Sequence, residues 1–183
     1  AICLAARDTI AIVSAHTNLD KAIKGLNDHF AKIIGLGPLV PLVPSEPPQE
    51  LAGIGRIGHL KASVRLRDLA EIVKNKLGIH SVRAAGDLDR NVQAIAVCTG
   101  SGGALIGEFL NSPADLYITG DLKYHEVRLI EENNRAVIDV GHFASERIGI
   151  DLLQEHLAQA AKKQGYNLAI KGFTKEKDPF TIV

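Results

Sequence analysis

Apolar residues in this sequence fall into short runs that alternate with amphipathic stretches. The first run, residues 9–16, is rich in β-branched side chains and predicts a buried strand. Thr17 or Asn18 can cap the helix that follows, and helical periodicity continues until Gly35. A proline-rich run over residues 38–48 predicts a stiff, extended connection.

The rest of the chain repeats strand and helix patterns. It predicts strands at 53–60, 81–85, 92–98, 115–119, 136–140 and 168–171, and helices at 66–77, 104–110, 122–132 and 145–163. This alternation favours an α/β fold, with a mainly parallel sheet, helices on both faces and two similar lobes. Residues 1–37 and 86–183 would form the main lobe. Residues 38–85 would form a smaller inserted lobe or linker region.

Composition narrows the choice of partners. The 183 residues carry 21 Lys and Arg against 21 Asp and Glu, so neither a nucleic-acid backbone nor an anionic membrane is favoured as a partner. The 4% aromatic content also disfavours stacking on nucleic-acid bases. Cys3 and Cys98 form no CxxC motif. With no basic leader and no spanning apolar run, we expect a reducing, cytoplasmic location.

Three pairs of histidine and carboxylate stand where predicted strands give way to helices. The members of each pair are four residues apart, so they share one helix face. The pairs are His16 with Asp20, Asp121 with His125, and His142 with Glu146. In open α/β sheets, ligands gather at the carboxyl ends of strands, where these pairs would meet.

Imidazole and carboxylate groups are the ligands of zinc, manganese and non-haem iron. The alternative is that each pair is a surface ion pair or a charge at a helix N-terminus. Three successive pairs weaken this alternative, because helix capping requires a carboxylate but not a histidine. The spacing alone leaves both interpretations open.

A glycine-rich loop, CTGSGG at 98–103, also lies between a predicted strand and helix. Its glycines would let a phosphate approach the backbone, yet the loop is neither GxGxxG nor a P-loop. A tight turn explains it equally well. Cys98 could be a nucleophile, although a cysteine that ends an apolar strand is more often part of the core.

Five ordered segments together resemble the NGG-one-interacting factor-three-like family, whose bacterial members are often named GTP cyclohydrolase one, type two. The segments are SAHTNLD at 14–20, GRIGHL at 55–60, CTGSGG at 98–103, ITGDLKYHE at 118–126 and DVGHFASERIG at 139–149. The closing KDPFTIV is also similar to the end of that family.

The resemblance implies a centre of two divalent metal ions (zinc, iron or manganese) inside a toroidal homohexamer. It implies that Asp20, His142 and Glu146 are metal ligands, with Glu146 as the bridge. His16 and His125 become candidates for proton transfer, and Asp121 becomes a close neighbour of the site.

The family takes further ligands from an N-terminal His-His-Pro motif, and this chain has no adjacent histidines. We therefore expect that the segment carrying the motif is absent. The leading hypothesis is a metal-dependent hydrolase that acts on a small nucleotide-like or phosphoester substrate. The alternative is a metal-binding scaffold or interaction protein without turnover.

Overall fold

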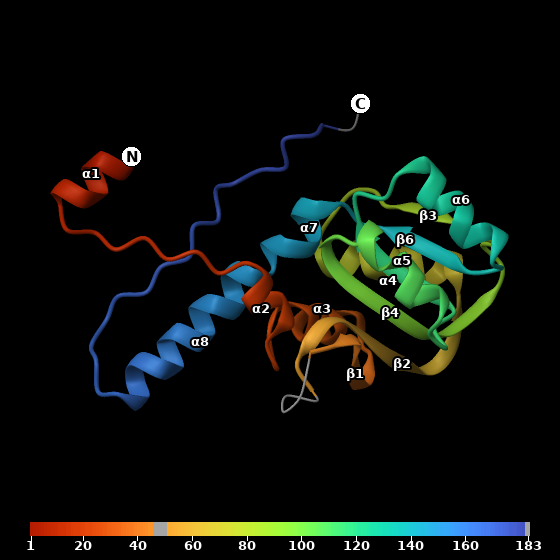
Figure 1. The fold of residues 1–183 in the computed structure, drawn as a ribbon, viewed down its shortest axis with the longest axis horizontal. Helices are drawn as coiled ribbons and strands as arrows, with labels where there is room; N and C mark the ends of the chain where they lie inside the picture. The colour runs from red at the N-terminus through yellow and green to blue at the C-terminus, as the bar shows by residue number, and fades with distance from the viewer. Residues whose placement is uncertain (46–50, 182–183) are drawn as a thin grey trace.

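The computed structural model describes residues 1–45 and 51–181 (Figure 1). A six-stranded sheet in the order β1-β2-β4-β5-β6-β3 forms its centre. The strands are β1 (Gly37–Pro44), β2 (Gly53–Arg65), β3 (Arg83–Ala85), β4 (Asn91–Ser101), β5 (Leu116–Gly120) and β6 (Ala136–Asp139). The helices are α1 (Ile2–Arg7), α2 (Thr17–Lys21), α3 (Leu26–Ile34), α4 (Leu66–Leu77), the 3-10 turn η1 (Gly103–Leu105), α5 (Ile106–Leu110), α6 (Tyr124–Glu132), α7 (His142–Arg147) and α8 (Gly149–Lys163).

The direction of the strands differs from the prediction. β4, β5 and β6 run parallel, whereas β1 with β2, β2 with β4 and β3 with β6 are antiparallel. The α/β class is confirmed, but a mainly parallel sheet is not. The reason is that alternation of strand and helix patterns leaves the direction of each returning strand open.

Helices cover both faces of the sheet. An apolar core lies on each face, and β4 contributes side chains to both cores. Ile95 and Val97 face one side, where they pack with α3 and α4. Ala96 and Cys98 face the other side, where they pack with α5 and α6. This alternation follows the two-residue period of a strand and explains why residues 94–98 of β4 are all apolar.

Residues from the predicted inserted lobe are part of the same sheet. Residues 37–44 form β1, which pairs with β2 at the edge. The prediction of an extended connection was wrong for this part, because prolines are tolerated on an edge strand. Pro47 and Pro48 lie outside the described residues. Two separate lobes are not confirmed, and the domain boundaries stay a prediction.

The N-terminal run was assigned wrongly. Residues 9–16 form no strand, and Ile12 and Val13 are exposed on a segment that leaves the body of the molecule (Figure 1). A β-prone sequence becomes a strand only where another strand pairs with it. The helix predicted after it is divided into α2 and α3, with Lys24 at a positive φ of 61° between them.

The C-terminal part also differs in detail. The helix predicted at 145–163 begins earlier, at His142, and changes direction near Ile148, so that α7 and α8 are separate. Residues 168–171 form no strand. No helix in the described part of the chain is long and apolar enough to cross a membrane.

Candidate metal centre

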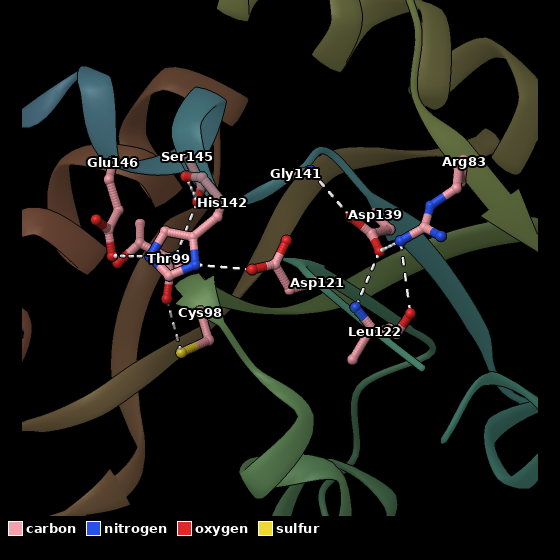
Figure 2. A network of polar contacts seen from close by, with 11 residues as sticks. Arg83, Cys98, Thr99, Asp121, Leu122, Asp139, Gly141, His142, Ser145 and Glu146 are labelled. Carbon is pink, nitrogen blue, oxygen red and sulfur yellow. Dashed lines mark hydrogen bonds and ion pairs between the residues drawn. The ribbon is translucent and has the colours of Figure 1, made fainter. Parts of the chain in front are cut away.

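His142 and Glu146 lie on the same face of α7, which begins directly beyond the end of β6 (Figure 2). Their spacing of four residues brings His142 Nε2 to 3.2 Å from Glu146 Oε1. Both side chains are partly open to solvent. An imidazole nitrogen and a carboxylate oxygen therefore face each other at the carboxyl end of the parallel strands.

Asp121 holds the other side of the same imidazole. Its Oδ2 lies 2.9 Å from His142 Nδ1, from the turn that follows β5 (Figure 2). Burial alone would lower the pKa of His142, but the hydrogen bond with Asp121 and the charge of Glu146 outweigh it and raise this pKa. The ring thus lies between two carboxylates from different elements.

Asp139, at the end of β6, joins the two segments that meet here. Its side chain is buried and accepts hydrogen bonds from the Leu122 N–H at 3.1 Å and the Gly141 N–H at 2.9 Å. Arg83 pairs with the same carboxylate (Figure 2). Asp139 was not selected from the sequence as a site residue. A carboxylate within a predicted strand, two residues before a glycine, was the available signal.

The glycine-rich loop is closely packed against α7. The Gly100 N–H donates to Ser145 Oγ at 2.8 Å, and Gly100 itself has a positive φ of 68°. A Cβ built on Gly100 would lie 2.5 Å from Glu146 Oε1. A Cβ on Gly120 would lie 2.6–2.8 Å from backbone atoms of Gly141, His142 and Gly100. The glycines let three backbone segments meet beneath the His142–Glu146 pair, which agrees with the tight-turn interpretation.

Gly100→Ala is expected to disturb the site more than the fold. The positive φ should cost about 1 kcal/mol of unfolding free energy, and the new methyl group should displace the Glu146 carboxylate. Gly78→Ala is the matched control, because Gly78 has φ 65° and open space at its Cβ position. Urea unfolding should show similar losses for both variants. Calorimetric zinc titration should show weaker binding only for Gly100→Ala, and equal binding by both would contradict the contact.

Asp20 lies near this pair, on α2. Partial burial raises the pKa of Asp20, the Glu146 charge raises it further, and His16 and His142 oppose that rise. Asn27 positions the segment by donating to the Asp20 carbonyl at 3.1 Å while it accepts from the Thr99 N–H at 2.9 Å. The structure thus places Asp20 within electrostatic range of the His142–Glu146 pair, and His16 within range of Asp20.

No three His, Cys, Asp or Glu side chains in the described ranges 1–45 and 51–181 are grouped closely enough to hold a metal ion. His142 and Glu146 are adjacent, and Asp20 is further away. His125 lies on the exposed surface of α6, where its ring packs edge-on against Tyr124. Among the described residues it makes no hydrogen bond or ion pair with His142. Its role stays a prediction.

A buried ion pair supports the segment that carries Asp20. The Arg56 side chain, from β2, is fully enclosed and pairs with Asp28 in the first turn of α3. The same guanidinium donates to the carbonyls of Gly53 at 2.6 Å, Gly55 at 2.7 Å and Ala22 at 3.1 Å. Arg56 therefore ties the chain between α2 and α3 to the sheet.

Cys98 is expected to be unreactive in the folded chain. Burial raises the pKa of its thiol to about 11, so very little thiolate is present at pH 8. Cys3 is exposed. Titration with Ellman's reagent should therefore give one fast thiol, with the second appearing only after addition of denaturant. Cys3→Ser should remove the fast phase, and a fast phase that persists would revive Cys98 as a nucleophile.

A family model for Duf34/NIF3 (NGG1p interacting factor 3) matches residues 1–179. The chain belongs to the Duf34/NIF3 family. The GTP cyclohydrolase 1 type 2 homolog of Clostridium acetobutylicum is 36% identical over 173 residues, which cover 94% of this chain and 65% of the relative. The NIF3 homolog of Schizosaccharomyces pombe is 33% identical over 186 residues, which cover 97% of this chain and 66% of the relative. The chain thus spans slightly less than two thirds of the length of these relatives.

A solved structure has the same fold. The Bacillus cereus protein related to NIF3 superposes with a TM-score of 0.89 at 22% sequence identity, over 97% of this chain and 75% of that protein. The family model and the two relatives confirm the family resemblance that was inferred from the five sequence segments.

Proposed function

We propose that this chain provides His142, Glu146 and Asp20 to a centre of two divalent metal ions, and that the natural protein uses the centre for hydrolysis. The observation that carries the proposal is the 3.2 Å approach of His142 Nε2 to Glu146 Oε1 while His142 Nδ1 is occupied by Asp121. An imidazole that bonds a carboxylate through one nitrogen is the usual arrangement of a histidine metal ligand.

The residues fit such a centre by their chemistry. One imidazole and two carboxylates suit zinc, iron or manganese. Two of the three groups already face each other, and Asp20 would have to approach them. Helix α2 can permit this, because it is five residues long and none of its side chains is buried. Of the two carboxylates, we propose Glu146 as the ligand shared by the two metal ions.

A bound divalent metal would lower the pKa of a water molecule and polarise a substrate oxygen. The protein residues would supply the remaining functions. His142 and Glu146 would hold the centre, and Asp121 would orient His142. His16, whose charge acts on Asp20, is the better placed candidate for proton transfer. His125 is the second candidate.

The substrate class is proposed from the relatives. Several relatives of this chain are named GTP cyclohydrolase 1 type 2 homolog, which supports a nucleotide-like or phosphoester substrate. A metal-binding scaffold without turnover is the second candidate. One observation favours it: the cavities of about 510 Å³ beside α8 and about 240 Å³ between α3, α4 and α7 are not lined by His142 or Glu146.

A hydrolysis screen separates these two candidates. The chain would be loaded with zinc, manganese or iron and then assayed with GTP and p-nitrophenyl phosphate. If the chain is a hydrolase, it should turn over at least one substrate. Removal of the metal with a chelator should stop turnover, and added metal should restore it. His142→Ala should abolish turnover. His156→Ala, at an exposed position on α8, is the matched control and should retain activity. A chain that binds metal tightly but turns over no substrate would favour the scaffold.

We also propose that the natural protein assembles as a homo-oligomer, most simply a hexameric ring, and that this chain alone self-associates less regularly. Exposed apolar side chains support this: Ile2, Leu4, Ile10, Ile12 and Val13 on the N-terminal segment are all open to solvent. Closed symmetry is the usual way to bury such a surface. Gel filtration with light scattering should give a mass several times 19.6 kDa. A monodisperse monomer would contradict the assembly.

A further inference from the structure

The turn after β5 holds Asp121 in an unusual backbone conformation beside the candidate ligand. Its φ is 57°, in the left-handed region that residues other than glycine seldom adopt. Gly120, just before it, has no room for a Cβ against the backbone of Gly141 and His142. The chain therefore leaves β5 pressed against the start of α7, and the turn directs the Asp121 carboxylate at His142 Nδ1 (Figure 2).

A second contact fixes the distance between the two segments. The Asp139 carboxylate accepts the N–H of Leu122, next to Asp121, and the N–H of Gly141, next to His142. Each partner of the Asp121–His142 pair thus has a chain neighbour bound to the same buried group. The pairing is held by the backbone and does not depend on side-chain conformation alone.

We propose that Asp121 is a positioning residue that keeps the proton of neutral His142 on Nδ1 and leaves Nε2 free to bind a metal. This inference takes from the proposed function only the assumption that His142 binds a metal ion. Two carboxylates compete for the ring proton, Asp121 at 2.9 Å from Nδ1 and Glu146 at 3.2 Å from Nε2. Asp121 is closer, and a carboxylate on Nδ1 determines the tautomer of a ligating histidine.

Removal of Asp121 would leave Glu146 as the remaining acceptor. The proton would then move to Nε2 and bind Glu146, so that both candidate ligands would block each other. The positive φ makes a clean variant possible, because glycine adopts this conformation without strain. Asp121→Gly should therefore fold at least as stably as the parent chain while it loses metal affinity. If Asp121 had only a structural role, its replacement would not lower metal affinity while stability is kept.

The experiment compares Asp121→Gly with Asn134→Gly. Asn134 is an exposed residue after α6 with φ 54°, so its change to glycine gives the same backbone relief away from His142. Long-range proton–nitrogen NMR of the metal-free chains, at a pH where the ring is neutral, reports the tautomer. We expect Nδ1–H in the parent and in Asn134→Gly, and Nε2–H in Asp121→Gly. Zinc affinity should fall about 10- to 100-fold only in Asp121→Gly.

The two readouts fail independently. If Asp121→Gly keeps the Nδ1–H tautomer, or if Asn134→Gly shifts it equally, the positioning role is wrong. If the parent chain binds no zinc and yet Asp121→Gly moves the proton to Nε2, the positioning role stands and the proposed metal function fails.

Discussion

Asp28→Asn is expected to lower the unfolding free energy by about 3–5 kcal/mol, because it leaves the Arg56 guanidinium buried without a counter-charge. Arg56 is 1% exposed, so water cannot replace the lost carboxylate. The variant keeps the shape of the side chain, which separates charge from packing. Guanidinium unfolding followed by circular dichroism measures the change.

Asp89→Asn is the matched control for this prediction. Asp89 pairs with Arg67 at 3.0 Å, but both side chains are more than half exposed. An exposed pair contributes about 0–1 kcal/mol, so this variant should unfold almost like the parent. If both variants lose the same unfolding free energy, the buried Arg56–Asp28 pair stabilises the fold no more than an exposed pair does.

Glu146→Gln should weaken divalent-metal binding by roughly 100-fold or more. The variant keeps the volume of the side chain and removes the charge that faces His142 Nε2. A residue that only orients a ligand typically contributes 10- to 100-fold in affinity, so loss of a direct ligand is expected to cost at least the upper end of that range. Calorimetric titration with zinc measures it.

Glu155→Gln provides the comparison for Glu146→Gln. Glu155 is exposed on α8, where its carboxylate accepts a hydrogen bond from Gln159. Its removal takes away the same charge at a distance from the candidate centre. Parental zinc affinity in Glu155→Gln together with a loss in Glu146→Gln assigns the effect to the site. If both variants bind zinc as tightly as the parent chain, Glu146 is not a ligand of the candidate metal centre.

The sequence predicts the His142–Glu146 pair well, because a spacing of four residues on one helix determines which side chains are neighbours. The sequence also predicts that the carboxyl ends of β4, β5 and β6 lie at the same edge of the sheet. It does not predict that Asp121, and not His125, contacts His142. That outcome depends on the left-handed turn at Asp121, which a single residue type does not reveal.

Other errors have equally local causes. β1 was missed because prolines suggested a connection, although an edge strand needs hydrogen bonds on one side only. Residues 9–16 were assigned as a strand because of their composition, although pairing requires a partner strand, which composition does not reveal. Asp139 was overlooked because its importance comes from two backbone N–H groups, 17 and 2 residues away.

Anomalous diffraction from a zinc-soaked crystal tests the central claim most directly. We predict a peak about 2.0–2.2 Å from both His142 Nε2 and a Glu146 carboxylate oxygen, with Asp20 drawn toward it. The Glu146→Gln crystal should lose that peak. Zinc bound only elsewhere, for example at the exposed His156, or a parental crystal with no peak between His142 and Glu146, would contradict the proposed metal centre.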